Sequence, residues 1–235
     1  MKHTDNNILQ KIFILLILLI FPVLISAEDY QYQYFNNEKD ESQYLPFSDY
    51  IARNRLHNDT VPHFLEDFYV LYGLKQYYNE NTLRKNISYL QAALKSNFRF
   101  PSKALVKINS DKEYHKYRNL MYMHINLLIM RSHMTIASKY DRIEVKFYDP
   151  VFSKEINESM DIAEKFYKEA LPYWKEAQKY SKEAGKIKIT TDLSFMESER
   201  FSINNGSLDF EKIINTHLKK IEKKRRKLSS STASK

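Results

Sequence analysis

The sequence of 235 residues contains no cysteine, and this absence excludes several classes of protein. Without cysteine there is no disulfide framework, no thiolate metal site, no cysteine nucleophile and no cysteine for lipid attachment. Glycine and proline are also scarce, at three and six residues. A β-sandwich or barrel needs a turn roughly every 8–12 residues, and so few turn residues cannot supply them. The composition therefore predicts an all-α fold of long helices.

Motifs for catalysis and metal binding are missing as well. The sequence has no H-E-x-x-H pair, no serine elbow, no glycine-rich phosphate loop and no EF-hand spacing. His115, His124 and His133 are nine residues apart along one predicted helix. Nine residues turn a helix by a net half-turn, so neighbouring histidines face opposite sides and cannot share a metal. We therefore expect no catalytic residue, no metal and no cofactor.

Paired carboxylates, which a glycosidase would need, occur only as near neighbours in the sequence. Glu66 is followed by Asp67, and Glu197 is separated from Glu199 by one residue. Residues at these spacings do not share a helix face. We expect all four to be solvated charges, and a cell-wall hydrolase is kept only as an alternative to a non-enzymatic function.

The N-terminal region contains an apolar run of fifteen residues, 12–26. This length is typical of a signal peptide and is shorter than the roughly 20 residues that span a bilayer. Ala27 is suitable before a cleavage site, but Ile25 is larger than position −3 prefers, so retention as an N-terminal anchor stays open. Both routes predict export to the periplasm or cell envelope of a bacterium. Residues 28–58 are predicted to form an extended polar and aromatic arm.

Helical periodicity and capping residues divide the remaining chain. A helical domain is predicted over residues 59–207, followed at 208–235 by a basic amphipathic helix and a disordered Ser/Thr tail. Gly185 is expected to end the fourth helix as a C-terminal cap. The architecture is expected to consist of antiparallel helical hairpins. The predicted helices run from Pro62 to about Tyr78, Leu83 to Lys95, Asp111 to about Tyr140, Ser153 or Asn157 to Gly185, and Leu208 to about Lys227.

Gly73 lies inside the first predicted helix, where glycine costs about 1 kcal/mol relative to alanine. Tyr69 precedes it by one helical turn, and Tyr72 and Gly73 form a large–small pair. Tyr89 and Ala92 occupy an aromatic and a small position in the following helix. This pattern resembles a tetratricopeptide repeat, a 34-residue helix–turn–helix unit. The resemblance implies that these five residues pack two helices closely together.

A partial second match to the repeat occurs at Ala163, Tyr167 and Ala170. An irregular helical bundle remains the alternative architecture. In the repeat family, the inner face of the first helix binds peptides or helices of other proteins. The resemblance therefore implies that a partner contacts Asp67, Val70, Leu74 and Tyr77.

The net charge of +8 is concentrated near the C-terminus, because residues 219–227 contain seven basic residues and one acidic residue. Such a segment can bind anionic lipid headgroups at roughly 1 kcal/mol per basic residue, or it can be a solvated helix end. The export signal disfavours nucleic acid as the partner. The predicted anionic-surface contacts are Lys219, Lys220, Lys223, Lys224, Arg225, Arg226 and Lys227.

Together these features predict an exported, non-enzymatic envelope protein that holds another envelope protein through a repeat-like helical surface. The alternative is a structural protein attached peripherally to an anionic membrane through its basic C-terminal helix. No small-molecule substrate is evident from the sequence.

Overall fold

The computed structural model describes residues 62–142 and 150–233, which belong to one compact unit. The predicted leader (1–27) and arm (28–58) lie outside these residues. The described chain is all-α, as predicted, and its only β feature is an isolated bridge between Phe64 and Asn97. The elements are α4 (Leu65–Phe68), the π-helix η1 (Tyr69–Gly73), α5 (Glu80–Lys95), the 3₁₀ helix η2 (Pro101–Lys103), α6 (Asp111–Tyr140), the 3₁₀ helix η3 (Pro150–Phe152), α7 (Ser153–Lys186), α8 (Ser194–Asn204) and α9 (Phe210–Ala233).

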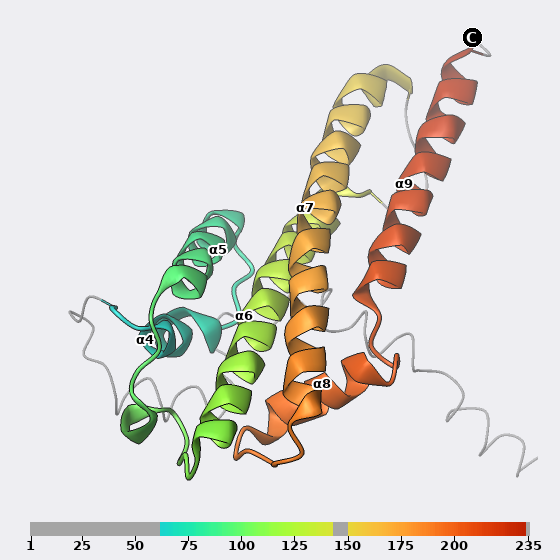
Figure 1. Cartoon of the computed structure of the whole chain (residues 1–235). Coiled ribbons are helices and arrows are strands. Elements are labelled where there is room, and N and C mark those ends of the chain that lie inside the picture. The colour runs from blue at the N-terminus through green and yellow to red at the C-terminus, as the bar shows by residue number, and fades with distance from the viewer. Residues whose placement is uncertain (1–61, 143–149, 234–235) are drawn as a thin grey trace, which may run out of the picture. The chain divides into compact units, whose positions relative to one another are not determined.

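The first hairpin pairs α4 and η1 with α5 (Figure 1). Its first helix ends at Gly73 rather than near Tyr78, so the predicted length was wrong. The second helix begins earlier than predicted, because the side chain of Asn79 caps it by accepting a hydrogen bond from the backbone amide of Asn81 at 2.9 Å.

The core is a long antiparallel hairpin of α6 and α7, which share the most extensive interface in the described chain. The hydroxyl of Ser159, near the start of α7, donates to the carbonyl of Tyr140 at the end of α6, at 2.9 Å. Further along, the rings of Tyr122 and Tyr180 stack with centroids 4.9 Å apart. With 30 and 34 residues, the two helices are about 45 and 51 Å long.

Alanine recurs at every seventh residue along the buried face of α7, at positions 163, 170, 177 and 184, and all four are fully buried. Buried residues also occur at 160, 167, 174 and 181, which completes the alternating 3–4 spacing of a heptad repeat. The small side chains allow neighbouring helices to approach α7 closely. Ala163, Tyr167 and Ala170, the partial match to a repeat, are thus two turns of a longer heptad pattern.

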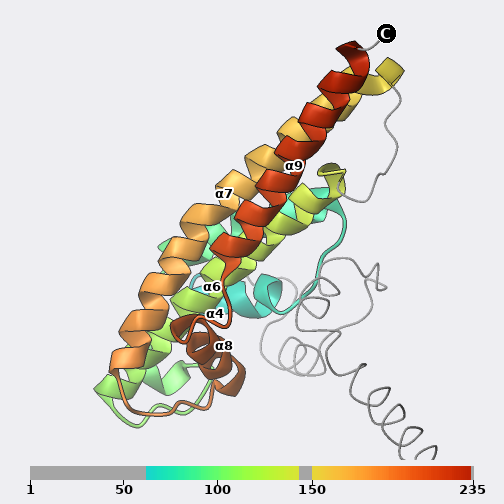
Figure 2. The same ribbon diagram turned by 90° about the vertical axis from the view of Figure 1, so that its right-hand side faces the viewer.

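The C-terminal part of the chain departs furthest from the predictions. Helix α8, in a region with only weak periodicity, was not predicted. Helix α9 reaches Ala233, so the predicted disorder after Lys227 was wrong for residues 228–233. Figures 1 and 2 show α9 running alongside α7, and its buried face carries Phe210, Ile214, His217, Ile221 and Leu228.

A buried polar cluster joins α9 to the hairpin. The hydroxyl of Tyr167 on α7 donates to Asp141 Oδ2 at the end of α6, at 2.8 Å, and lies 2.8 Å from Nδ1 of His217 on α9. All three side chains are buried.

Among the described residues, no helix is long and apolar enough to cross a membrane.

Candidate functional site

The predicted partner-binding face is not open to a partner. Asp67, Val70 and Leu74 are buried, and only Tyr77 is partly exposed. This prediction was wrong because α4 and η1 pack against α5, and η1 also contacts α6. The face assigned to a partner is therefore occupied by the chain's own helices.

The five predicted helix-packing residues lie at or near the contact between η1 and α5. The rings of Tyr72 and Tyr89 stack with centroids 4.1 Å apart, and Tyr69 and Gly73 are buried. Ala92, in contrast, is partly exposed, and the neighbouring Ala93 is the fully buried small residue.

Gly73 is required by side chains rather than by a close approach to the backbone of α5. A Cβ atom built on it would lie 2.5 Å from the ring of Tyr69 and 3.2 Å from Cδ1 of Leu128 on α6. The repeat pattern implied that the glycine allows a close approach of the second helix, α5. Instead, the glycine accommodates a tyrosine of its own helix and a leucine of α6.

The three histidines of α6 have separate environments. His115 is exposed. His124 Nδ1 lies 2.6 Å from Glu199 on α8. His133 is buried against the rings of Phe166 and Tyr173, and neither ring nitrogen has a hydrogen-bond partner among the described residues. Within the described residues, no group of histidines and carboxylates is arranged to hold a metal ion.

The near-neighbour carboxylates are not solvated, so that expectation was wrong. Glu66 is fully buried and accepts hydrogen bonds from the backbone amide of Arg99 and the hydroxyl of Tyr117, at 3.0 and 3.1 Å. Burial raises the pKa of Glu66. Asp67 forms an ion pair with the guanidinium of Arg99. Both carboxylates fix the connection between α5 and α6.

Glu197 and Glu199 of α8 contact different groups on α6. Burial alone would raise the pKa of Glu199, but the charges of Arg131 and His124 outweigh it and lower this pKa to about 2. Glu197 Oε1 accepts from the buried ammonium of Lys116 at 2.6 Å. The contacts of Glu199 with Arg131 and His124 and of Glu197 with Lys116 attach α8 to α6, and the two carboxylates do not converge on a common point.

A hollow of about 570 Å³ lies between the end of α7 and α8. Four of its lining residues are basic and no carboxylate lines it. Sequence analysis missed this site because its residues come from α7, the connection after it and α8, which was not predicted. The lining residues are Gln178, Lys182, Gly185, Lys186, Lys188, Arg200, Ile203 and Asn204.

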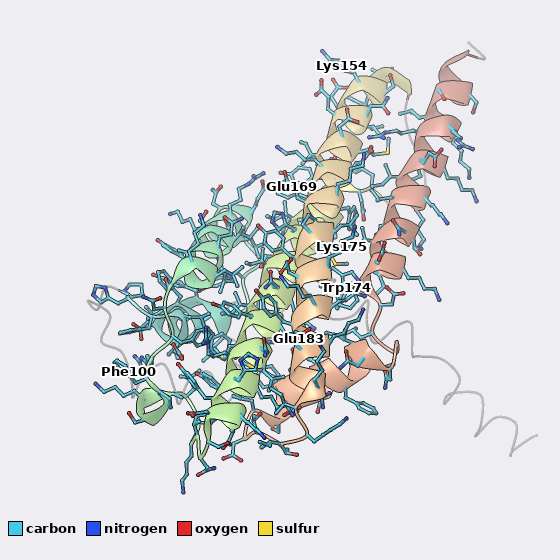
Figure 3. The ribbon with its side chains drawn as sticks, viewed as in Figure 1. Phe100, Lys154, Glu169, Trp174, Lys175 and Glu183 are labelled. Carbon is cyan, nitrogen blue, oxygen red and sulfur yellow. The ribbon has the colours of Figure 1, made fainter. Side chains whose placement is uncertain are left out.

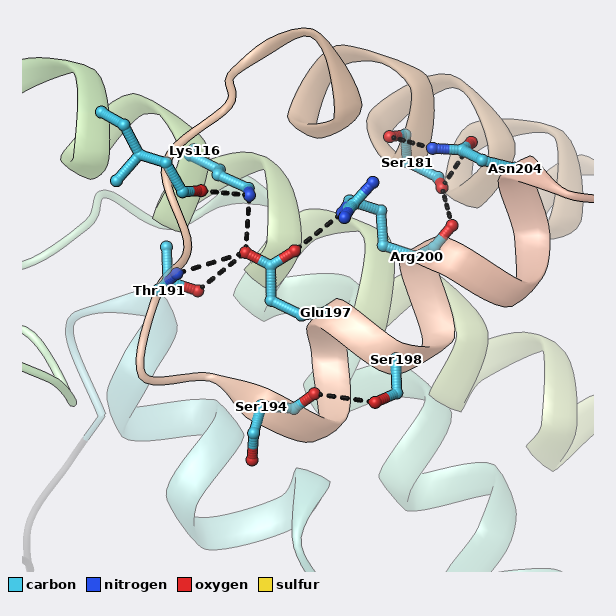
Figure 4. Close-up of polar contacts among 9 residues, drawn as sticks. Lys116, Ser181, Thr191, Ser194, Glu197, Ser198, Arg200 and Asn204 are labelled. Atoms are coloured by element: carbon cyan, nitrogen blue, oxygen red, sulfur yellow. Dashed lines mark hydrogen bonds and ion pairs between the residues drawn. The ribbon is translucent and has the colours of Figure 1, made fainter.

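Figure 4 shows the polar contacts that support this hollow. Arg200 Nε donates to Glu197 Oε2 at 2.7 Å, while Lys116 and the hydroxyl and amide of Thr191 hold the other carboxylate oxygen. Although burial alone would raise the pKa of Glu197, the hydrogen bonds from Lys116 and Arg200 hold that pKa below its usual value. Glu197 is therefore an anion that fixes the position of Arg200.

Six of the seven basic residues predicted on α9, all except Lys220, divide into two groups. Arg225 pairs with Asp161 and Glu164 of α7, Arg226 pairs with Glu222, and Lys224 Nζ donates to a backbone carbonyl. These contacts hold α9 in place or neutralise charge. By contrast, Lys219, Lys223 and Lys227 are exposed and form no ion pair with any residue that the structure describes.

Exposed apolar residues accompany the C-terminal half of α9. Val151 and Phe152 of η3 are 76% and 56% exposed, and η3 contacts both α7 and α9. Lys154 follows in the first turn of α7. In Figure 3, Lys154 marks this end of α7 and Glu183 lies toward the opposite end. We call the surface formed by Val151, Phe152, Lys154 and the C-terminal half of α9, where Lys223 and Lys227 are exposed, the apolar–basic end.

The comparisons with known proteins place this bundle in a family. Residues 112–231 match the family model described as Domain of unknown function (DUF8513). The match covers just over half of the chain, and the protein belongs to this family. It contains nearly all of α6 and α9 and the whole of α7 and α8, and therefore both the hollow and most of the apolar–basic end. No curated protein matches the chain, and no solved structure matches it.

Proposed function

We propose that this protein is a non-enzymatic attachment protein that binds an anionic membrane surface through its apolar–basic end. The observation that carries the proposal is the exposure of Val151 and Phe152 beside the C-terminal half of α9, which carries the exposed Lys223 and Lys227. An exposed aromatic ring next to cations suits the boundary between lipid headgroups and acyl chains.

Neither the exposed apolar side chains nor the lysines would bind a membrane strongly alone, but together they suffice for reversible binding. Burying the exposed part of a phenylalanine contributes up to about 1.5–3 kcal/mol. Each lysine near an anionic surface adds roughly 1 kcal/mol. Stable anchoring generally requires two such signals. The ion pairs of Arg225 with Asp161 and Glu164 support the proposal, because they hold the C-terminal half of α9 against the first turns of α7, which follow η3.

The repeat-like character belongs in this proposal to the first hairpin only. The α4–α5 segment carries the stacked Tyr72 and Tyr89, whereas α6 and α7 are each about as long as a whole 34-residue repeat. Export to the cell envelope, as the leader predicts, is part of the proposal. The divergence of Glu197 and Glu199 favours a non-enzymatic role over a hydrolase.

Cosedimentation with vesicles tests the attachment. We expect binding to phosphatidylglycerol vesicles and little binding to phosphatidylcholine vesicles, with loss at high salt. Phe152→Asp is expected to weaken binding about tenfold. Its matched control is Phe201→Asp on α8, which is 63% exposed but lies at the other end of α7.

A charge-reversal experiment tests whether the lysines of the apolar–basic end or the overall net charge of the protein drives vesicle binding. Lys154, Lys223 and Lys227 are replaced together by glutamate and compared with the same replacement at Lys85, Lys103 and Lys107, which are also exposed. Loss of binding in the first variant alone supports the proposal. Equal loss in both would show that overall charge, rather than the apolar–basic end, drives binding.

A further inference from the structure

We propose that the hollow between α7 and α8 is a binding site for a phosphorylated small molecule. This site is independent of the membrane attachment proposed above. It lies near the C-terminal end of α7, whereas η3 precedes the N-terminal end of the same 34-residue helix.

The polar lining of the hollow offers mainly hydrogen-bond donors. Three ammonium groups, one guanidinium and two amide side chains line it, and Ile203 is its one apolar side chain. A ligand with several anionic oxygens can accept from most of these groups at once. The volume of about 570 Å³ falls within the range of sites that bind small molecules.

Arg200 is fixed in a position that suits an anion. Its Nε donates a hydrogen bond to Glu197, and its Nη1 lies 3.5 Å from the position that a Cβ atom of Gly185 would take. The end of the guanidinium is therefore directed over the glycine at the wall of the hollow. Because Glu197 is itself held by the buried Lys116, Arg200 loses little side-chain entropy when a ligand binds.

Asn204 is fixed in a similar way. Its Oδ1 accepts from the hydroxyl of Ser181 at 2.9 Å and its Nδ2 donates to the carbonyl of Ser181 at 3.2 Å. Ser181 is fully buried. Nδ2 carries a second hydrogen, which can donate to a ligand. Two donors of the site are thus positioned by buried groups before any ligand arrives.

The charge balance of the hollow is positive. Lys186 is paired with Glu183 at 2.7 Å and Arg200 with Glu197. Lys182 and Lys188 form no ion pair with the part of the chain that the structure describes, so two positive charges remain uncompensated. This surplus matches the charge of a phosphate monoester or of a larger phosphorylated group.

Isothermal titration calorimetry with pyrophosphate tests the site. We expect the full-length protein to bind pyrophosphate with a dissociation constant of about 1 mM or lower. The double variant Lys182→Gln/Lys188→Gln is expected to bind at least about tenfold more weakly, because it removes both uncompensated charges. The control is Lys175→Gln, an exposed lysine on another part of α7.

Two further measurements, with citrate and with vesicles, make the outcome decisive. Binding of citrate but not pyrophosphate would overturn the assignment to phosphate. Equal weakening in the Lys175→Gln control, or no binding of pyrophosphate at about 10 mM, would overturn the site itself. Vesicles containing phosphatidic acid distinguish a lipid headgroup from a soluble phosphate: the proposed soluble ligand predicts that pyrophosphate binding, but not vesicle binding, is lost in the double variant. Because Phe152→Asp affects only the apolar–basic end, failure of one proposal is distinguishable from failure of the other.

Discussion

The amide nitrogen Nδ2 of Asn204 lies 2.8 Å from the position that a Cβ atom would occupy on Gly185. No residue other than glycine fits at this position without moving Asn204. Gly185 lies within the last turn of α7, which continues to Lys186, and its backbone is not left-handed. The predicted role as a C-terminal cap was therefore wrong: Gly185 allows α8 to dock on α7.

This relationship predicts a reversal of sign between two backgrounds. In the native protein, Gly185→Ala should lower stability by about 1 kcal/mol, because displacing Asn204 breaks its two hydrogen bonds to Ser181. In an Asn204→Ala background, the same substitution should raise stability by up to about 1 kcal/mol, the helix-propensity gain of alanine over glycine. Urea denaturation of the four variants measures both effects. The same sign in both backgrounds would contradict the docking role.

The alanines of the heptad pattern predict a strong intolerance of larger residues. Ala177→Leu should destabilise the protein by about 1–3 kcal/mol, because leucine overpacks a fully buried position. Lys175→Leu, at an exposed position of the same helix, controls for the effect of leucine on helix propensity. A thermal melt in which both variants behave alike would show that the face is not tightly packed.

Two buried tyrosines predict opposite responses to loss of their hydroxyl groups. Tyr69 Oη has no hydrogen-bond partner among the described residues, so Tyr69→Phe should leave stability unchanged or raise it by up to about 1 kcal/mol. Tyr117 donates to buried Glu66, so Tyr117→Phe should cost about 1–3 kcal/mol. Chemical denaturation compares the two. A cost for Tyr69→Phe as large as that for Tyr117→Phe would reveal an unrecognised partner.

His133 predicts a loss of stability in mild acid. Burial lowers its pKa to about 4, and the charge of Arg84 contributes. Glu169 Oε2 is 3.5 Å away, which is too far for a good hydrogen bond to the ring. Because the pKa in the folded state lies below the ordinary value of 6.5, the unfolded chain binds the proton first as the pH falls.

The stabilising contribution of neutral His133 is therefore present above pH 6.5 and is lost between pH 6.5 and 4, by at most about 3 kcal/mol. His133→Leu should remove this part of the pH dependence. His115→Leu, at an exposed position, is the control. Stability curves for the native protein and His133→Leu that stay parallel over this range would contradict the burial of a neutral histidine.

The sequence was sufficient to predict the helical class and the long core helix. The limits of α6 follow from Ser110, whose side chain caps its first turn, and from an apolar centre that other helices surround. Helix α5 was predicted nearly correctly because its apolar positions share one face. Helices with strong local sequence signals were therefore predicted almost correctly.

Side-chain environments were less predictable, because they depend on residues distant in the sequence. Asp67 reads as a surface charge, yet it pairs with Arg99, 32 residues later. Glu197 and Glu199 looked solvated, yet they meet Lys116 and His124, more than 70 residues earlier. Burial of a charge requires a partner that only the tertiary fold supplies.

One signal in the sequence extends further than the pattern to which it was assigned. Ala163, Tyr167 and Ala170 matched half of a tetratricopeptide repeat, although alanine also follows at 177 and 184. Continued over four heptads, the spacing predicts a long helix packed closely by its neighbours. The hollow had no comparable signal, because its donors come from three separate segments, the end of α7, the connection after it and α8, with no common period.

The absence of cysteine allows the proposed membrane attachment to be tested by placing a single label at one position. Phe152→Cys and Phe100→Cys are each labelled with an environment-sensitive NBD fluorophore. Phe100 is 74% exposed. The neighbouring Arg99 carbonyl accepts a hydrogen bond from the hydroxyl of Tyr114 in the first turn of α6, which is far from η3. On adding phosphatidylglycerol vesicles, we expect the fluorophore at 152 to brighten and shift to the blue, and the fluorophore at 100 to stay unchanged. An unchanged signal at 152, or a shift at 100 alone, would contradict attachment through the apolar–basic end.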